Sequence, residues 1–99
     1  MKTKSTSPSC ASKLKILSDP TRLSVLEALM EGSKNVGDLM EQLDVEQSLL
    51  SHHLAILRDA GLVEATREGK SMIYQLPETV SGSTAGKAIN LGCCKISFD

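Results

Sequence analysis

The sequence predicts a mainly helical domain with one small β-hairpin, arranged as a winged helix-turn-helix. Two segments with helical spacing of apolar residues are joined by only three residues, Asp44–Glu46. After Gly61 the spacing changes from helical to alternating, which is typical of strands. The length of 99 residues suits one compact domain, and because aromatic residues are few, Leu, Val, Ile and Met must fill its core.

The first two helices are predicted from local signals. Residues 1–11 form a polar stretch that we expect to be a flexible arm, in which Pro8 disfavours a helix. A short helix is expected over residues 12–17. Asp19 and Pro20 then predict the start of a second helix, because an aspartate caps free backbone amides and proline fits the first helical position.

The third and fourth helices form the helix-turn-helix unit. Gly32 is expected to end the second helix, and Asn35 to begin a short third helix that ends near Leu43, with Asp38 in a capping-box-like position. The fourth helix is expected over residues 47–60. Its inward face carries three leucines at helical spacing, namely Leu50, Leu54 and Leu57.

A hairpin and a tail complete the chain. Strands are expected at residues 62–67 and 72–76, joined by a partly basic tip. The winged helix-turn-helix domain is therefore assigned to residues 12–80. Residues 81–99 begin as a Gly/Ser linker and end as a cysteine-containing tail, which is too apolar to stay in solvent and should dock in an extended form.

In a winged helix the second helix of the unit enters the major groove of DNA and the hairpin contacts the backbone. The first two turns of residues 47–60 carry outward hydrogen-bonding side chains without carboxylates, and further along the helix and on the hairpin lie basic side chains suited to phosphates. The net charge of −1 is not typical of a nucleic-acid binder. What matters for DNA binding is therefore whether basic and polar side chains gather on one face. The predicted DNA-binding residues are Gln47, Ser48, Ser51, His52, Arg58, Arg67 and Lys70.

Three segments resemble the ArsR/SmtB repressor family: LSDPTRLSVLEAL at 17–29, LDVEQSLLSHHLAILRDAGLV at 43–63 and VEATREGKSMIYQL at 63–76. The resemblance implies a homodimer that binds a palindromic operator and is released by an inducer. It also implies DNA contacts from the first two turns of the fourth helix. The chain departs from the family at Asp44, where glycine is common, and at Glu46, where a small capping serine is usual. Glu46 is a poorer cap, and its charge near phosphates should weaken binding mildly.

The three cysteines are the candidate inducer site. The N-terminus lacks an apolar signal core and no run is long enough to span a membrane, so we expect a cytoplasmic protein with reduced thiols. Thiolates select soft ions, and trivalent arsenic or antimony favours three sulfurs. The predicted ligands are Cys93, Cys94 and Cys10, since Gly92 permits a turn that brings the adjacent pair to one ion. Similar vicinal cysteines occur in some arsenic-responsive family members.

Several alternatives stay open for these cysteines. Cys10 could be a bystander, the pair could pack as apolar side chains, or the thiols could form a reversible disulfide or persulfide switch. Cadmium and lead also accept three thiolates, and the site could lie within one chain or across the dimer. His52 and His53 are not expected to share an ion, because adjacent helical residues point about 100° apart. The family's zinc sensors carry His and Asp pairs on a final helix, and no His follows His53 here.

An enzyme is not expected. The chain has no C-x-x-C motif, no βαβ pattern and no acid or base next to the cysteines, which argues against a thiol oxidoreductase. No cofactor is required by the predicted function. A winged helix that binds protein instead of DNA is the remaining alternative from another class, and the polar outward face of residues 47–60 argues against it.

Overall fold

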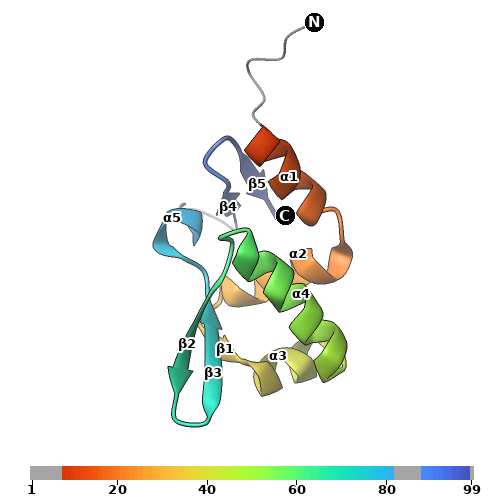
Figure 1. Cartoon of the computed structure of the whole chain (residues 1–99), viewed down its shortest axis with the longest axis vertical. Coiled ribbons are helices and arrows are strands. Elements are labelled where there is room, and N and C mark those ends of the chain that lie inside the picture. The colour runs from red at the N-terminus through yellow and green to blue at the C-terminus, as the bar shows by residue number, and fades with distance from the viewer. Residues whose placement is uncertain (1–7, 82–87, 99) are drawn as a thin grey trace, which may run out of the picture.

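Helices dominate the structure, a computed structural model that describes residues 8–81 and 88–98 (Figure 1). The helices are α1 (Pro8–Ile16), α2 (Pro20–Leu29), α3 (Val36–Leu43), α4 (Gln47–Asp59) and α5 (Glu78–Ser81). The strands are β1 (Lys34–Asn35), β2 (Glu64–Glu68), β3 (Ser71–Gln75), β4 (Ala88–Asn90) and β5 (Lys95–Ser97). The predicted fold class, a winged helix-turn-helix, is confirmed.

Helix α1 begins earlier than the sequence predicted. The expectation that Pro8 disfavours a helix was wrong, because Pro8 is the first residue of α1. A proline is tolerated there, since the first helical N–H has no partner within the helix in any case. The predicted flexible arm thus overlaps α1 from residue 8 onward, and the rest of it, residues 1–7, lies outside the described residues.

The start of α2 is confirmed in detail. Asp19 is the N-cap, and its Oδ1 accepts hydrogen bonds from the backbone N–H groups of Thr21, at 2.8 Å, and Arg22, at 3.2 Å. Desolvation acts to raise the pKa of the Asp19 carboxyl. The two N–H donors and the charges of His53 and Arg22 outweigh it and hold that pKa below its ordinary value of 3.8.

This lowered pKa gives the fold a predictable pH dependence. A carboxyl with a depressed pKa stabilises the folded state above its unfolded value of 3.8, and the contribution is lost as the pH falls through the folded value. We therefore expect wild type to be more stable than Asp19→Asn at neutral pH, and this advantage to vanish below pH 3.8. Thermal melts of both proteins across this range measure it. An advantage that stays constant with pH would contradict the assignment.

The helix-turn-helix unit follows the predicted signals. The Asn35 Oδ1 accepts a hydrogen bond of 2.7 Å from the Asp38 N–H, and α3 ends at Leu43 as expected. Asp44 adopts the left-handed conformation with φ 55°, which explains why glycine is a natural alternative in this turn. The inward leucines of α4 are buried as predicted, Leu50, Leu54 and Leu57.

The wing is a three-stranded antiparallel sheet in the order β1-β3-β2. Strands β2 and β3 pair up to Glu68 opposite Ser71, and the turn between them uses Gly69 with φ +62°. The hairpin was predicted, but β1 was not. Its two residues pair with Tyr74 and Ile73 of β3, so it is a strand only because the wing folds back onto it.

The tail docks as predicted and takes the form of a second hairpin, β4–β5. Ile89 and Leu91 are buried in the main core, and Gly92 has φ +91°, which suits a tight turn. The short helix α5 was not foreseen. Most of the predicted Gly/Ser linker, residues 82–86, lies outside the described residues.

The two hairpins lie at opposite ends of the molecule. Figure 1 shows β4–β5 beside α1 at one end, while the wing and α3 occupy the other. Helix α4 runs between these ends, and α2 lies behind it. Within the described residues no helix is both long and apolar enough to cross a membrane.

Candidate functional site

The predicted DNA-reading side chains lie on the surface at the start of α4. Each of the four predicted from its first two turns is exposed: Gln47, Ser48, Ser51 and His52. Their positions recur at helical spacing, so they share one face. Leu49, which sequence reasoning missed, is also 45% exposed at this end of α4. Its apolar side chain is of the kind that can contact a thymine methyl group.

Glu46 departs from good capping in the way the sequence predicted. It is the N-cap of α4 but makes no side-chain cap hydrogen bond. Instead its Oε1 accepts a hydrogen bond of 2.8 Å from the Ser48 hydroxyl. Glu46 therefore leaves the first amides of α4 without a side-chain partner and also engages a hydroxyl that we assign to DNA.

Replacing Glu46 with serine should both stabilise the fold and strengthen operator binding. We expect Glu46→Ser to raise the free energy of unfolding by about 1 kcal/mol through capping. It should also tighten operator binding about two- to fivefold, because a negative charge near the phosphates is removed. Urea unfolding and operator titration measure the two effects. Glu46→Ala is the control, since it removes the charge without adding a cap. Equal stability of the two variants would contradict the capping argument.

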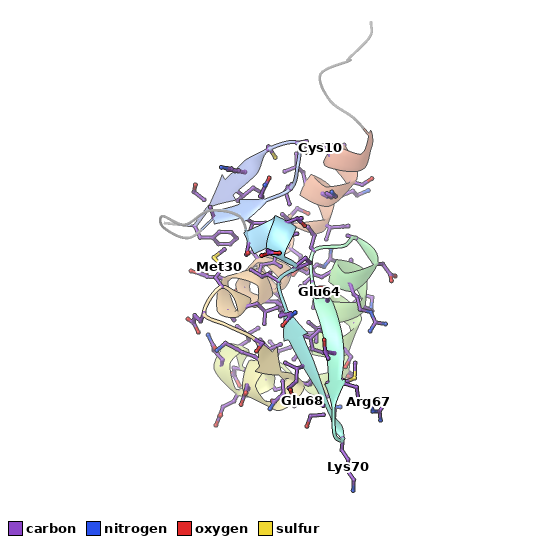
Figure 2. The ribbon with its side chains drawn as sticks, turned by 90° about the vertical axis from the view of Figure 1, so that its left-hand side faces the viewer. Cys10, Met30, Glu64, Arg67, Glu68 and Lys70 are labelled. Carbon is purple, nitrogen blue, oxygen red and sulfur yellow. A yellow bond between two sulfur atoms is a disulfide. The ribbon has the colours of Figure 1, made fainter. Side chains whose placement is uncertain are left out.

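The basic candidates are exposed but widely spread. Figure 2 shows Lys70 at the tip of the wing and Arg67 beside it on β2. Arg58 is exposed in the last turn of α4, far along the helix from Gln47. The acidic Glu68 is also exposed near the wing tip. The wing thus offers single basic side chains suited to phosphate contacts and no continuous basic surface.

The three cysteines meet at the other end of the molecule, within one chain. Their Sγ atoms all lie within 4.8 Å of one another. Cys10 comes from α1, while Cys93 and Cys94 follow the Gly92 turn between β4 and β5. Cys10 and Cys93 form a disulfide, and Cys94 is a free, half-buried cysteine. Sequence reasoning had left a disulfide as one alternative, and this pairing links residues 83 positions apart.

One hydrogen bond joins the tail to α1 and two more shape the turn within the tail. The Lys13 Nζ donates a hydrogen bond of 3.2 Å to the Leu91 carbonyl, and the Asn90 Oδ1 accepts one of 2.9 Å from the Gly92 N–H. Leu91 also donates its N–H to the Cys94 carbonyl at 2.8 Å, closing the turn. The cysteines of the tail are therefore positioned by packing and hydrogen bonds besides the disulfide itself.

The two histidines have separate environments. His52 is exposed, whereas His53 is 6% exposed and accepts a hydrogen bond of 3.0 Å at Nδ1 from the Arg22 Nε. Their ring centroids lie 5.5 Å apart, with the planes tilted by 60°. His53 thus packs inside the domain. No feature of the sequence pointed to its pairing with Arg22.

Comparisons with known proteins agree with this geometry. Residues 19–65 match the model of the family described as "Bacterial regulatory protein, arsR family". The transcriptional regulator NmtR of Mycobacterium tuberculosis is 42% identical over 79 residues, 80% of this chain and 66% of that protein. The biofilm growth-associated repressor of Xylella fastidiosa is 35% identical over 85 residues, 86% of this chain and 75% of that protein.

A solved structure also resembles this chain. Reduced HlyU from Vibrio cholerae matches with a TM-score of 0.68 and 37% identity, over 72% of this chain and 75% of that one. The relatives and the fold are those of DNA-binding transcriptional regulators and not of enzymes. The prediction that the chain is not an enzyme is thereby confirmed.

Proposed function

Because the chain belongs to the arsR family of bacterial regulatory proteins, we propose that it is a metalloid-responsive transcriptional repressor. It binds a palindromic operator as a homodimer, and trivalent arsenic or antimony releases it by binding the cysteine thiolates. A repressor acts where its operator is, so the proposal places the protein in the cytoplasm. It requires no cofactor.

One observation carries the choice of inducer: the sulfurs of Cys10, Cys93 and Cys94 lie within 4.8 Å of one another. Arsenite, As(OH)3, reacts with three thiols to give As(SR)3 and three waters, so three converging thiols match its valence. The soft donor set also favours a soft ion over magnesium or calcium. The disulfide must first be reduced, and two equivalents of a small cellular thiol supply both electrons and protons while forming their own disulfide.

The disulfide favours a second candidate function, which is thiol redox sensing by the same repressor. Cys10 and Cys93 are paired in the structure, and the Cys94 sulfur lies close to both. Oxidation of the two thiols by hydrogen peroxide would form this bond with release of two waters, and a persulfide sensor would use the same thiols. Cadmium and lead remain further candidates, because both accept three thiolates.

Release of DNA requires the cysteine cluster to act at a distance. The cluster lies at the α1 end and the wing tip at the opposite end, as Cys10 and Lys70 in Figure 2 show. Operator half-sites lie about 34–36 Å apart, so a modest change in the angle or separation of two recognition helices breaks the match. Binding that ties the tail to α1 need favour the released state by only a few kcal/mol.

Operator release by a panel of effectors tests the proposal. Reduced protein bound to promoter DNA is treated with arsenite, antimonite, cadmium, lead, zinc and persulfide. We expect release by arsenite and antimonite and none by zinc. Release by persulfide alone would support redox sensing and reject the metalloid proposal. Failure to bind DNA in the absence of effector would reject both and favour a winged helix that binds protein.

A further inference from the structure

A partly buried side-chain bridge connects three helices between the cysteine cluster and the DNA-reading face. The Arg22 Nε donates to the His53 Nδ1 at 3.0 Å, and the Arg22 Nη1 donates to the Ile16 carbonyl at 2.9 Å. Ile16 is the last residue of α1, Arg22 lies in the first turn of α2, and His53 lies in α4. One guanidinium therefore joins the end of the cysteine-bearing helix to the recognition helix.

The two hydrogen bonds of this bridge form only when their acceptors hold fixed relative positions. Because Nδ1 accepts the hydrogen bond, the proton of a neutral His53 ring sits on Nε2. The planar guanidinium presents its donors in a fixed fork, so both acceptors must hold their relative positions for both bonds to form. His53 is the buried polar side chain of the described core, and losing its partner in such a setting is costly.

Helix α1 can carry a displacement from one end to the other. Cys10 lies near its beginning and Ile16 is its last residue, six positions away, which is about 9 Å of helix. The backbone hydrogen bonds of α1 link its two ends, so we expect a displacement at one end to reach the other. A change at the Cys10 sulfur, whether a new bond to arsenic or the loss of the disulfide, therefore also shifts the Ile16 carbonyl that Arg22 holds.

The other end of the bridge reaches the proposed DNA face directly. His53 is adjacent to His52, whose exposed ring lies 5.5 Å from it between centroids. The Asp19 carboxylate, held by the amides of Thr21 and Arg22, also attracts the Arg22 guanidinium at the centre of the bridge. A movement of the Arg22 guanidinium thus acts on α4 at the turn that carries predicted DNA contacts.

We propose that Arg22 and His53 are positioning residues that transmit the state of the cysteine cluster to the recognition helix. This inference rests on the proposed function, since it needs an effector at Cys10, Cys93 and Cys94. The two residues touch neither the effector nor the operator. Their role is to make the orientation of α4 depend on the position of α1, which turns cysteine chemistry into a change of operator affinity.

The test compares operator affinity with and without arsenite in four reduced proteins: wild type, Arg22→Lys, His53→Leu and His53→Asn. Lysine keeps the charge but offers no fork, and leucine keeps burial but removes the acceptor. Asparagine places its Oδ1 near the position of Nδ1 and serves as the conservative control. Thermal melts report the fold, and arsenic bound per chain reports the untouched cysteines. As a second effector arm, operator affinity is also compared between the forms with and without the disulfide.

The affinity ratio is the operator affinity without arsenite divided by that with arsenite. For wild type we expect a value in the usual range of coupling, about 5- to 150-fold. In Arg22→Lys and His53→Leu it should drop towards one while arsenic binding stays unchanged, and His53→Asn should restore most of it. A lower melting temperature with an undiminished ratio in His53→Leu would show a purely structural role and overturn the inference. A wild-type ratio of one in both effector arms would overturn the proposed function, and the inference with it.

Discussion

In the double variant Cys93→Ser/Cys94→Ser, arsenite no longer releases operator DNA. A serine hydroxyl is a hard, weakly acidic ligand and does not replace a thiolate on trivalent arsenic. The variant keeps one sulfur of the cluster, Cys10, which cannot hold arsenic tightly on its own. Because Cys93 is exposed and Cys94 half-buried, the substitutions should leave the fold and the arsenite-free operator affinity close to wild type. Fluorescence anisotropy of labelled operator under reducing conditions measures the response.

Two further variants sharpen this experiment. Cys10→Ser removes the α1 ligand alone, and we expect it to lose release even where a two-sulfur complex still forms, because arsenic then no longer bonds the tail to α1. Lys95→Ala alters the same hairpin at an exposed position without removing sulfur, and it should respond as wild type. Release of the double variant at wild-type arsenite concentrations would show that the site lies elsewhere.

The triple variant Gln47→Ala/Ser51→Ala/His52→Ala should lose specific operator binding. A good bidentate base contact is worth about 1–3 kcal/mol of discrimination, so removing three hydrogen-bonding side chains should lower specific affinity by at least about tenfold. The three side chains are exposed, so the melting temperature should stay close to that of wild type. Binding to random DNA should persist, because phosphate contacts from Arg67 and Lys70 remain.

The matched control for this variant is Thr79→Ala, an exposed change on α5, away from α4. It should leave both specific and random binding unchanged. The assignment of the DNA face is refuted if the triple variant retains wild-type discrimination between operator and random DNA. A loss of random binding together with specific binding would instead indicate general damage to the fold.

The elements with strong local signals could be predicted from the sequence. Asp19 and Asn35 cap their helices as their residue types indicate, and the buried leucines of α4 follow the helical period. Elements that depend on distant partners could not. Strand β1 exists because two residues meet β3, and the β4–β5 hairpin is held by its contacts with α1 and the core. Pro8 shows a third case, since its effect depends on where the helix starts.

In the candidate site, too, some features could be predicted from the sequence and others could not. The shared exposed face of the α4 residues proposed to contact DNA was predictable because they lie on one continuous helix, where spacing fixes the face. The cysteine types pointed to soft-ion or redox chemistry, but the pairing of Cys10 with Cys93 depends on how the tail docks. Nothing local marks the Arg22–His53 contact, which joins residues 31 positions apart. Such long-range pairs follow from packing and are visible only in the folded chain.

The central claim is that the state of the cysteine cluster sets operator affinity. It is tested most directly by titrating the reduced wild-type protein on labelled operator with arsenite, while counting arsenic and free thiols per chain. The account predicts one arsenic per chain, loss of three titratable thiols, and a fall in operator affinity of at least about fivefold that follows arsenic binding. Stoichiometric arsenic binding with unchanged operator affinity would contradict it.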